Sequence, residues 1–162
     1  MKRKNQQTAS AARFATMSEL SRRGYDTSFT MGNTMKVDLF AAVPDGEQFT
    51  IQVKGISNRN GLFVSESFFA GKVQRKLYLV VVYVPPIDVA HESFEFYILP
   101  HKAAKREFEK LPKLNKKGEP YSISGLNWSS ISEYRDRWDS FPSTQPRRER
   151  KNLPEENMER CG

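Results

Sequence analysis

The sequence contains little cysteine, little histidine and no long apolar run. Cys161 is the only cysteine, which excludes a disulfide within the chain and a zinc site built from several cysteines. No segment reaches the about 18 consecutive apolar residues of a membrane span, and no apolar stretch of about 7–15 residues follows the basic start, as a signal peptide requires. We therefore expect a protein of the reducing cytoplasm, with no membrane partner.

Negative charge is also scarce relative to positive charge. The 162 residues include 26 Lys and Arg against 19 Asp and Glu, which gives a formal net charge of +7. Excess positive charge speeds association with polyanions, so nucleic acid is an expected partner. Aromatic residues make up 12% of the chain, which argues against a wholly disordered protein. The length suits one domain, which we predict over residues 10–141, between a disordered basic N-terminus (residues 1–9) and a disordered charged tail (residues 142–162).

The first part of the chain predicts one helix and three strands. These are a helix at residues 10–23 and strands at residues 25–30, 36–43 and 48–56. The helical segment lacks Pro and Gly, places Phe14, Met17 and Ser21 on one side, and stops at Gly24, a typical glycine C-cap. The turn signal at residues 44–46 joins the last two strands into an antiparallel hairpin.

The second part predicts a central strand and several peripheral elements. Residues 77–84 form a continuous apolar run of Leu, Tyr and Val, the composition of a strand covered on both faces of a sheet. Ser130 and Glu133 form a capping-box pattern near the start of a helical repeat of aromatic residues. The other expected elements are a mostly irregular segment at 55–71 with a short strand at 62–64, a strand at 93–99, a helix at 102–111 and a last helix at 130–140. Together they predict an α/β fold with a central mixed β-sheet flanked by helices.

Three polar side chains interrupt the apolar strands. Gln52 and Lys54 lie two residues apart, so they project from the same face, because side chains alternate along a strand. If the hairpin forms, counting back from its turn brings Asp38 level with Gln52 and Lys54. We therefore expect an acid, an amide and an amine to converge on one face of the sheet.

These residues and the order of the elements resemble the PD-(D/E)XK nucleases, the restriction-endonuclease-like family that includes Holliday-junction resolvases. The resemblance covers about residues 10–100 and implies a core of the αβββαβ type. The family has an acid on the second strand, where Asp38 stands, and an acid-x-Lys pattern on the third, where Lys54 occupies the last position. Gln52 stands where the common pattern has Asp or Glu, a QxK variant similar to that of some small homing endonucleases of this fold.

The expected activity is that of a Mg²⁺-dependent endodeoxyribonuclease. Phosphodiester hydrolysis needs a divalent cation to offset charge on the phosphate oxygens and to activate water, and Mg²⁺ prefers oxygen ligands. Asp38, Gln52 and the Val53 carbonyl would supply those oxygens, and Mn²⁺ is an expected substitute for Mg²⁺. Lys54 would orient or help deprotonate the water.

Glu19 and the histidines are weaker candidates. The resemblance makes Glu19 a further candidate catalytic acid, since family members often place a Glu on the first helix facing the site. Glu19 could equally pair with Arg22 or Arg23 on its own helix. His91 and His101 flank a predicted strand and have no Cys or acid at metal-ligand spacing, so we expect no ligand role for either.

Basic residues close after the third strand are expected to contact the backbone of duplex or branched DNA. These are Arg59, Lys72, Arg75 and Lys76. One site in each subunit must act twice to cut a duplex, so a homodimer or homotetramer is expected. Two alternatives stay open. One is a catalytically weak or inactive DNA- or junction-binding protein of the same fold, motivated by Gln52, and the other is a protein-interaction module of the immunity type whose basic face meets an acidic partner.

Overall fold

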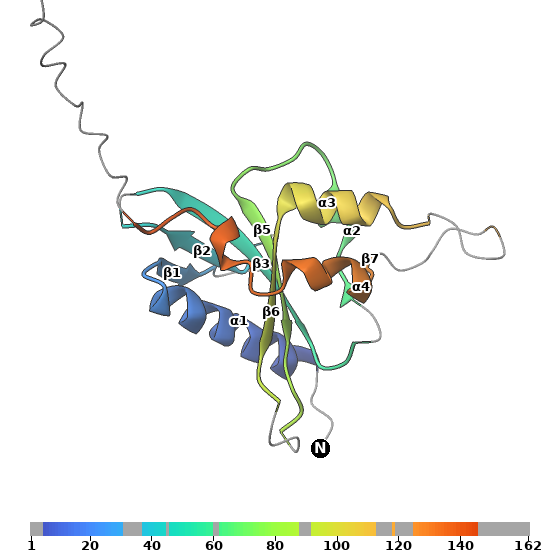
Figure 1. Cartoon of the computed structure of the whole chain (residues 1–162), viewed down its shortest axis with the longest axis horizontal. Helices are drawn as coiled ribbons and strands as arrows, with labels where there is room; N and C mark the ends of the chain where they lie inside the picture. Colours follow the sequence, from blue (N-terminus) through green and yellow to red (C-terminus); the bar gives the residue numbers. More distant parts are fainter. Residues whose placement is uncertain are drawn as a thin grey trace, which may run out of the picture.

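The computed structural model describes residues 5–30, 37–44, 46–59, 62–87, 92–112, 118 and 125–145, and it has the expected α/β fold (Figure 1). Its helices are α1 (Asn5–Arg22), α2 (Glu66–Phe69), α3 (His101–Glu109) and α4 (Trp128–Ile131), with 3-10 turns η1 (Ser132–Tyr134) and η2 (Trp138–Ser140). Its strands are β1 (Asp26–Phe29), β2 (Leu39–Ala42), β3 (Gln48–Ile56), β4 (Leu62–Phe63), β5 (Leu77–Tyr83), β6 (Glu95–Pro100) and β7 (Gly125–Leu126). Apart from the short β4, the order through β5 is the αβββαβ order that the resemblance implies.

Five strands form one mixed sheet in the order β1-β2-β3-β5-β6. β3 and β5 run parallel, with Thr50 opposite Leu77 and Lys54 opposite Val81, whereas the other neighbours are antiparallel. Every residue of β5 is buried, because this strand is central and covered on both faces, as its apolar run predicted. β4 and β7 form a separate two-stranded ladder.

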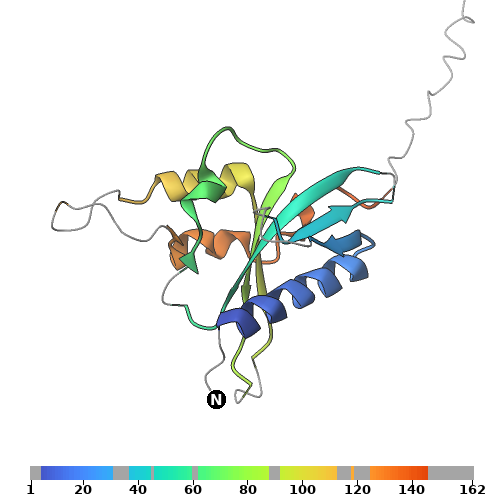
Figure 2. The same cartoon turned by 180° about the vertical axis from the view of Figure 1, so that it is seen from behind.

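The two faces of the sheet carry separate apolar clusters. Ile51 and Val53 of β3 point toward α1 and pack with Ala12 of that helix. Leu79 and Val81 of β5 point the other way, into a cluster that α2, α3 and α4 complete. Figures 1 and 2 show α1 on one side of the sheet and α3 and α4 on the other. None of the described helices is long and apolar enough to cross a bilayer.

α1 differs from its prediction at its start, since it begins at Asn5 rather than at residue 10. Of the residues that share one side of it, Phe14 is 64% exposed, whereas Met17 is partly buried against the core. The buried residues recur at every fourth position and are Thr8, Ala12, Thr16 and Leu20. The reason is a close approach to β3: a Cβ atom at Gly55 would lie 2.6 Å from the Thr8 carbonyl oxygen and 2.8 Å from the Ala12 Cβ. Helix and strand are therefore too near for large side chains between them.

Both predicted turns form. Gly24 has a φ of 84° and closes α1, with hydrogen bonds from Gly24 N to Ser21 O (3.0 Å) and from Tyr25 N to Leu20 O (3.2 Å). The β2–β3 hairpin is antiparallel, and Gly46 N donates to Val43 O at its turn (2.9 Å).

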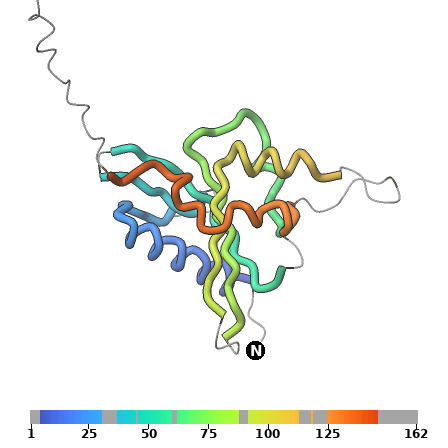
Figure 3. The backbone as a smooth tube through the Cα atoms, in the orientation of Figure 1, coloured from blue at the N-terminus to red at the C-terminus, as the bar shows by residue number. Residues whose placement is uncertain are grey.

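The predicted last helix at residues 130–140 was wrong. α4 begins at Trp128, with Asn127 as its N-cap, so Ser130 does not cap it. The helix breaks because Arg135 forms a bridge to Tyr97 and Asp136 N donates to Phe96 O (2.8 Å), both on the edge of β6. Figure 3 shows this orange segment crossing β6 before it runs on in red. Pairing with a sheet edge has replaced helical hydrogen bonds that the local pattern favoured.

The segment at residues 55–71 is more ordered than its composition predicted. It includes the expected short strand, as β4, and the helical turn α2, which the sequence analysis missed. Phe68 and Phe69 of α2 are buried, and this burial stabilises so short a helix. Beyond Gln145, the predicted tail lies outside the described residues. Of its first four residues, which are described, Pro142 accepts a hydrogen bond at its carbonyl oxygen from the Tyr25 hydroxyl (2.7 Å).

Candidate functional site

The candidate site lies where β2 separates from β3. Asp38 immediately precedes β2, and its backbone N donates to Ile51 O (2.9 Å). The next N–H along this edge of β3, that of Val53, donates to Asp38 Oδ2 (2.8 Å). The carboxylate thus takes the place that a backbone carbonyl of β2 would otherwise hold, and it lies in the fork between the strands, at the level of the sheet.

The Val53 carbonyl opens on the same fork. The N–H and C=O of one strand residue point toward the same neighbouring strand. Thr50 N donates to Lys76 O (2.8 Å) and Ile56 O accepts from Val84 N (2.7 Å), so the even-numbered residues of β3 face β5. Val53 belongs to the odd-numbered set and faces β2, which places its carbonyl oxygen beside the Asp38 carboxylate.

Gln52 and Lys54 share a face, as the strand period predicted. Their neighbours Ile51 and Val53 belong to the cluster under α1, so these two side chains project to the opposite face. Gln52 Oε1 is buried and has no hydrogen-bond partner among the residues that the structure describes. Lys54 is a half-buried residue, and its ammonium forms no ion pair with any described residue. An unpartnered acceptor and an unpaired cation therefore lie two residues apart on one strand.

Asp38 does not share that face, and this part of the expectation was wrong. Its second oxygen, Oδ1, accepts a hydrogen bond from Arg13 Nε of α1 at 2.6 Å, so it is turned toward the α1 side. The side chain of Asp38 is 17% exposed and that of Arg13 is 40% exposed. The carboxylate is tied to the edge of β3 by the N–H of Val53, the residue between Gln52 and Lys54, whereas the side chains of these two residues project from the opposite face.

Arg13 is the site residue that sequence reasoning missed. It directly follows Ala12 in the buried stripe of α1, so it flanks the line along which the helix contacts β3. The available signal was a basic residue beside a stripe of small residues. The sequence suggests this role for Arg13 only if Thr8, Ala12 and Thr16 are assigned to the buried side of the helix and Phe14 to the exposed side. Arg13 thus pairs with the carboxylate at the fork from the α1 side, and the second cationic residue, Lys54, projects from the opposite face of β3.

Glu19 forms both of the ion pairs that its own helix offered. Its carboxylate accepts hydrogen bonds from Arg22 (2.6 Å) and from Arg23. The bond from Arg23 is the main cause that holds the pKa of Glu19 below its usual value. The guanidinium of Arg23 also stacks 4.0 Å from the centroid of the Trp138 ring. Both arginines thus pair with Glu19 on its own helix, and its catalytic role stays a prediction.

Arg59 belongs to a second polar cluster, around Glu95. Glu95 accepts hydrogen bonds from Arg59 (2.8 Å) and from the Tyr97 hydroxyl (2.8 Å), and Arg135 lies 3.4 Å away. The Arg59 guanidinium also lies 4.4 Å from the centroid of the Tyr83 ring. Burial, with the bond to Glu95, raises the pKa of Tyr97 to about 12. Arg59 therefore has protein partners, and its predicted contact with DNA stays a prediction.

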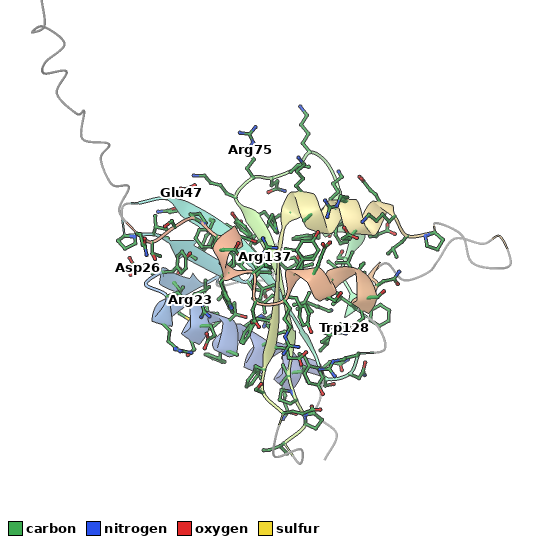
Figure 4. The ribbon with its side chains drawn as sticks, in the orientation of Figure 1. Arg23, Asp26, Glu47, Arg75, Trp128 and Arg137 are labelled. Carbon is green, nitrogen blue, oxygen red and sulfur yellow. The ribbon has the colours of Figure 1, made fainter. Side chains whose placement is uncertain are left out.

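The other predicted DNA contacts lie toward the start of β3, at the end where β2 and β3 are paired and away from the direction in which the fork opens. Lys72, Arg75 and Lys76 precede β5, whose first residue is opposite Thr50. The distance along β3 from Thr50 to Lys54 is about 13 Å for four residues. The side chains of all three cations are exposed, and Figure 4 shows Arg75 pointing away from the body of the molecule.

His101 holds two segments of the chain together by hydrogen bonds. It is buried, its Nδ1 accepts from Gln74 N (2.9 Å), and Nε2 lies 2.8 Å from the Phe68 carbonyl oxygen. These bonds define a neutral ring with the proton on Nε2, and they fix the loop that carries Lys72. His91 lies outside the described residues.

The oxygens of Asp38, Val53 and Gln52 are of the kind that a hard divalent cation prefers. The Asp38 carboxylate, the Val53 carbonyl and Gln52 Oε1 are all oxygen ligands, which Mg²⁺ prefers. A buried acceptor such as Gln52 Oε1 needs a donor or an ion to satisfy it. In the described part of the chain, no group of three His, Cys, Asp or Glu side chains could hold a metal ion. The ligand set would thus hold one carboxylate and otherwise neutral oxygens.

Comparison with known proteins gives a structural likeness but no match in sequence. The sequence matches no protein-family model and no curated protein. Among solved structures, that of the bacterial homing endonuclease I-Ssp6803I is similar to this chain, with a TM-score of 0.49 and 17% sequence identity over 84% of this chain and 90% of that one. A likeness at this level does not bear on the roles of the site residues.

Proposed function

We propose that this protein is a divalent-metal-dependent DNA endonuclease whose site is the fork between β2 and β3. The observation that carries the proposal is the set of unsatisfied groups beside one carboxylate. Gln52 Oε1 lacks a donor, Lys54 lacks an anion among the described residues, and both flank the Val53 peptide whose N–H binds Asp38. An ion with a phosphate would supply both missing partners. The basic sequence, with a net charge of +7, suits a nucleic-acid substrate.

Each residue at the fork has a distinct task in this proposal. Asp38, the Val53 carbonyl and Gln52 would hold Mg²⁺ or Mn²⁺. Once bound, the ion would offset charge on the scissile phosphate and lower the pKa of the attacking water. The Lys54 ammonium, on the face of Gln52, would orient that water and stabilise the negative charge that develops on phosphate oxygens.

The test is plasmid nicking by the purified protein with Mg²⁺ or Mn²⁺. We expect Asp38→Asn to lower the nicking rate by about 10²-fold or more, since it removes the single carboxylate of the ligand set. Asp26→Asn is the matched control, because Asp26 is an exposed carboxylate on β1. If the wild-type protein nicks DNA and Asp38→Asn nicks it equally well, the site is misplaced.

The second candidate is a DNA- or junction-binding protein of this fold that does not cleave. It is favoured by the ion pair of Arg13 with Asp38, which occupies one oxygen of the carboxylate, and by the amide of Gln52. A salt-dependent mobility shift without a metal-dependent product would support this candidate over the endonuclease.

Neutralising one phosphate-contacting cation, as in Arg75→Gln, should reduce the slope of log affinity against log salt by about 1. An unchanged slope would contradict contact of Arg75 with phosphate.

The homodimer or homotetramer expected for cutting both strands stays a prediction. Sedimentation of the protein with and without duplex DNA measures it directly. A monomer in both conditions would restrict the proposed activity to one strand per binding event.

A further inference from the structure

We propose that Arg13 holds the Asp38 carboxylate in the DNA-free protein and transfers to a DNA phosphate when the divalent ion binds, so that ion and DNA bind cooperatively. This inference rests on the proposed function and deepens it. It makes Arg13 a positioning residue of the site and the phosphate backbone its second partner.

The first step of the argument is the occupancy of the carboxylate. Asp38 Oδ1 accepts from Arg13 Nε at 2.6 Å, and Oδ2 accepts from Val53 N at 2.8 Å. A divalent ion that takes Oδ1 must replace the guanidinium or lie against it. Two cations in contact repel each other strongly at a partly buried position, where water screens charge less than in bulk. The DNA-free protein should therefore bind the ion weakly.

The second step is that Arg13 can exchange partners while its backbone stays fixed. Its Cα belongs to α1, which packs closely on β3 at Gly55, whereas its side chain is 40% exposed. Asp38 is its one ionic partner among the described residues. A displaced guanidinium would remain next to the fork and would need another anion. Guanidinium groups match phosphate oxygens with two parallel hydrogen bonds, so a DNA phosphate at the site fits that need.

The third step is thermodynamic. If phosphate relieves the cost of displacing Arg13, DNA raises the affinity for the ion, and the ion raises the affinity for DNA by the same factor. The free protein would then carry little bound metal and would load it together with its substrate. Lys54 adds to this dependence, since its ammonium is a second positive charge near the fork without an anion among the described residues.

The experiment is an equilibrium titration with Mn²⁺, followed by electron paramagnetic resonance, on the full chain. Without DNA, Arg13→Gln should bind Mn²⁺ about tenfold more tightly than the wild-type protein, because one contacting positive charge is gone. Arg22→Gln is the matched control: Arg22 lies on the same helix and pairs with Glu19, and this variant should match the wild type. Arg13→Lys keeps the charge and should remain close to the wild type.

A short phosphorothioate duplex, which slows cleavage, supplies the second arm. It should raise the Mn²⁺ affinity of the wild-type protein by about tenfold and that of Arg13→Gln by clearly less. Thermal unfolding checks that each variant is folded. If Arg13→Gln is not, Arg13→Met replaces it, since it also removes the charge and should show the same tighter Mn²⁺ binding without DNA. Arg13→Lys should respond less than the wild type to the duplex, because an ammonium cannot form two parallel hydrogen bonds to phosphate.

Two unfavourable results are distinct. If Asp38→Asn removes Mn²⁺ binding but Arg13→Gln binds no more tightly than the wild type, the inference is overturned and the proposed function stands. If Mn²⁺ binding is the same in the wild type and in Asp38→Asn, with and without duplex, the metal site itself is wrong and both fall.

Discussion

Asp38 immediately precedes β2, and Glu95 is the first residue of the edge strand β6. The two carboxylates differ in whether the polar groups around them all have hydrogen-bond partners. Glu95 accepts from Arg59 and Tyr97, and Arg135 lies 3.4 Å away. Asp38 has donors for both oxygens as well, but its neighbours are incomplete: Gln52 Oε1 has no partner among the described residues. In the Glu95 cluster the carboxylate and its donors are paired with one another, whereas beside the fork a buried acceptor is left without a donor among the described residues.

The difference teaches how to separate a structural cluster from a binding site in one molecule. Unsatisfied buried polar groups cost stability, so a fold retains them chiefly where something else completes them. By that criterion the fork is the proposed functional region, and we expect the Glu95 cluster to stabilise the fold. Variants of the two regions should therefore show opposite effects. Variants at the fork should lose activity, and variants at Glu95 should lose stability.

After Asp38→Asn, the largest effect is expected for Lys54→Met. Loss of the ammonium should lower the metal-dependent nicking rate by about 10²-fold, because no other described cation takes its place on that face of β3. The free energy of unfolding should change by less than about 0.5 kcal/mol, since Lys54 has no ion pair to lose. Single-turnover nicking at saturating DNA and urea unfolding measure the two quantities. A large loss of stability would show that Lys54 stabilises the fold, as the Glu95 cluster is expected to do.

Glu95→Gln should show the reverse pattern. It removes the carboxylate that pairs Arg59 and Arg135, so the free energy of unfolding should fall by about 1–3 kcal/mol while nicking at saturating DNA is unchanged. Urea unfolding measures the loss, with the exposed Glu66→Gln as the control. Equal stability of Glu95→Gln and Glu66→Gln would contradict a structural role for the cluster.

Gln52→Met should separate stability from function at one position. It replaces a buried, unpartnered oxygen with an apolar group of similar length, so the free energy of unfolding should rise by about 1 kcal/mol. Nicking should fall, because a proposed ligand is lost. Unfolding measured without metal decides the first point, and a decrease in stability would mean that Oε1 has a partner in solution.

The smallest effect is a pH dependence of the Glu95 cluster. Burial alone would raise the pKa of Glu95, but hydrogen bonds from Tyr97 and Arg59 outweigh it and lower the pKa below the ordinary value of 4.5. A carboxylate with a depressed pKa in the folded state stabilises the fold above its unfolded pKa, and this stabilisation is lost as pH falls through the folded pKa. The stability difference between the wild type and Glu95→Gln should therefore shrink from about pH 6 to about pH 3. A constant difference would show that the charge of Glu95 contributes nothing.

Much of the fold, and part of the site, could be predicted from the sequence. The apolar run at residues 77–84, the turn at 44–46 and the C-cap at Gly24 are local signals, and each formed as expected. The common face of Gln52 and Lys54 also follows from the strand period alone. The broken helix after Trp128 could not be predicted, since it depends on the free edge of β6, which no local pattern reveals.

The chain by itself determined which residues alternate, where it turns and which strand is central, because these properties depend on spacing between near neighbours. Only the tertiary structure decided that Arg13 meets Asp38, 25 positions away, and that Arg59 meets Glu95, 36 positions away. Contacts between distant segments depend on how closely α1 approaches β3 and on the order of strands in the sheet. Gly55 sets the first of these, and its effect appears only when helix and strand are placed together.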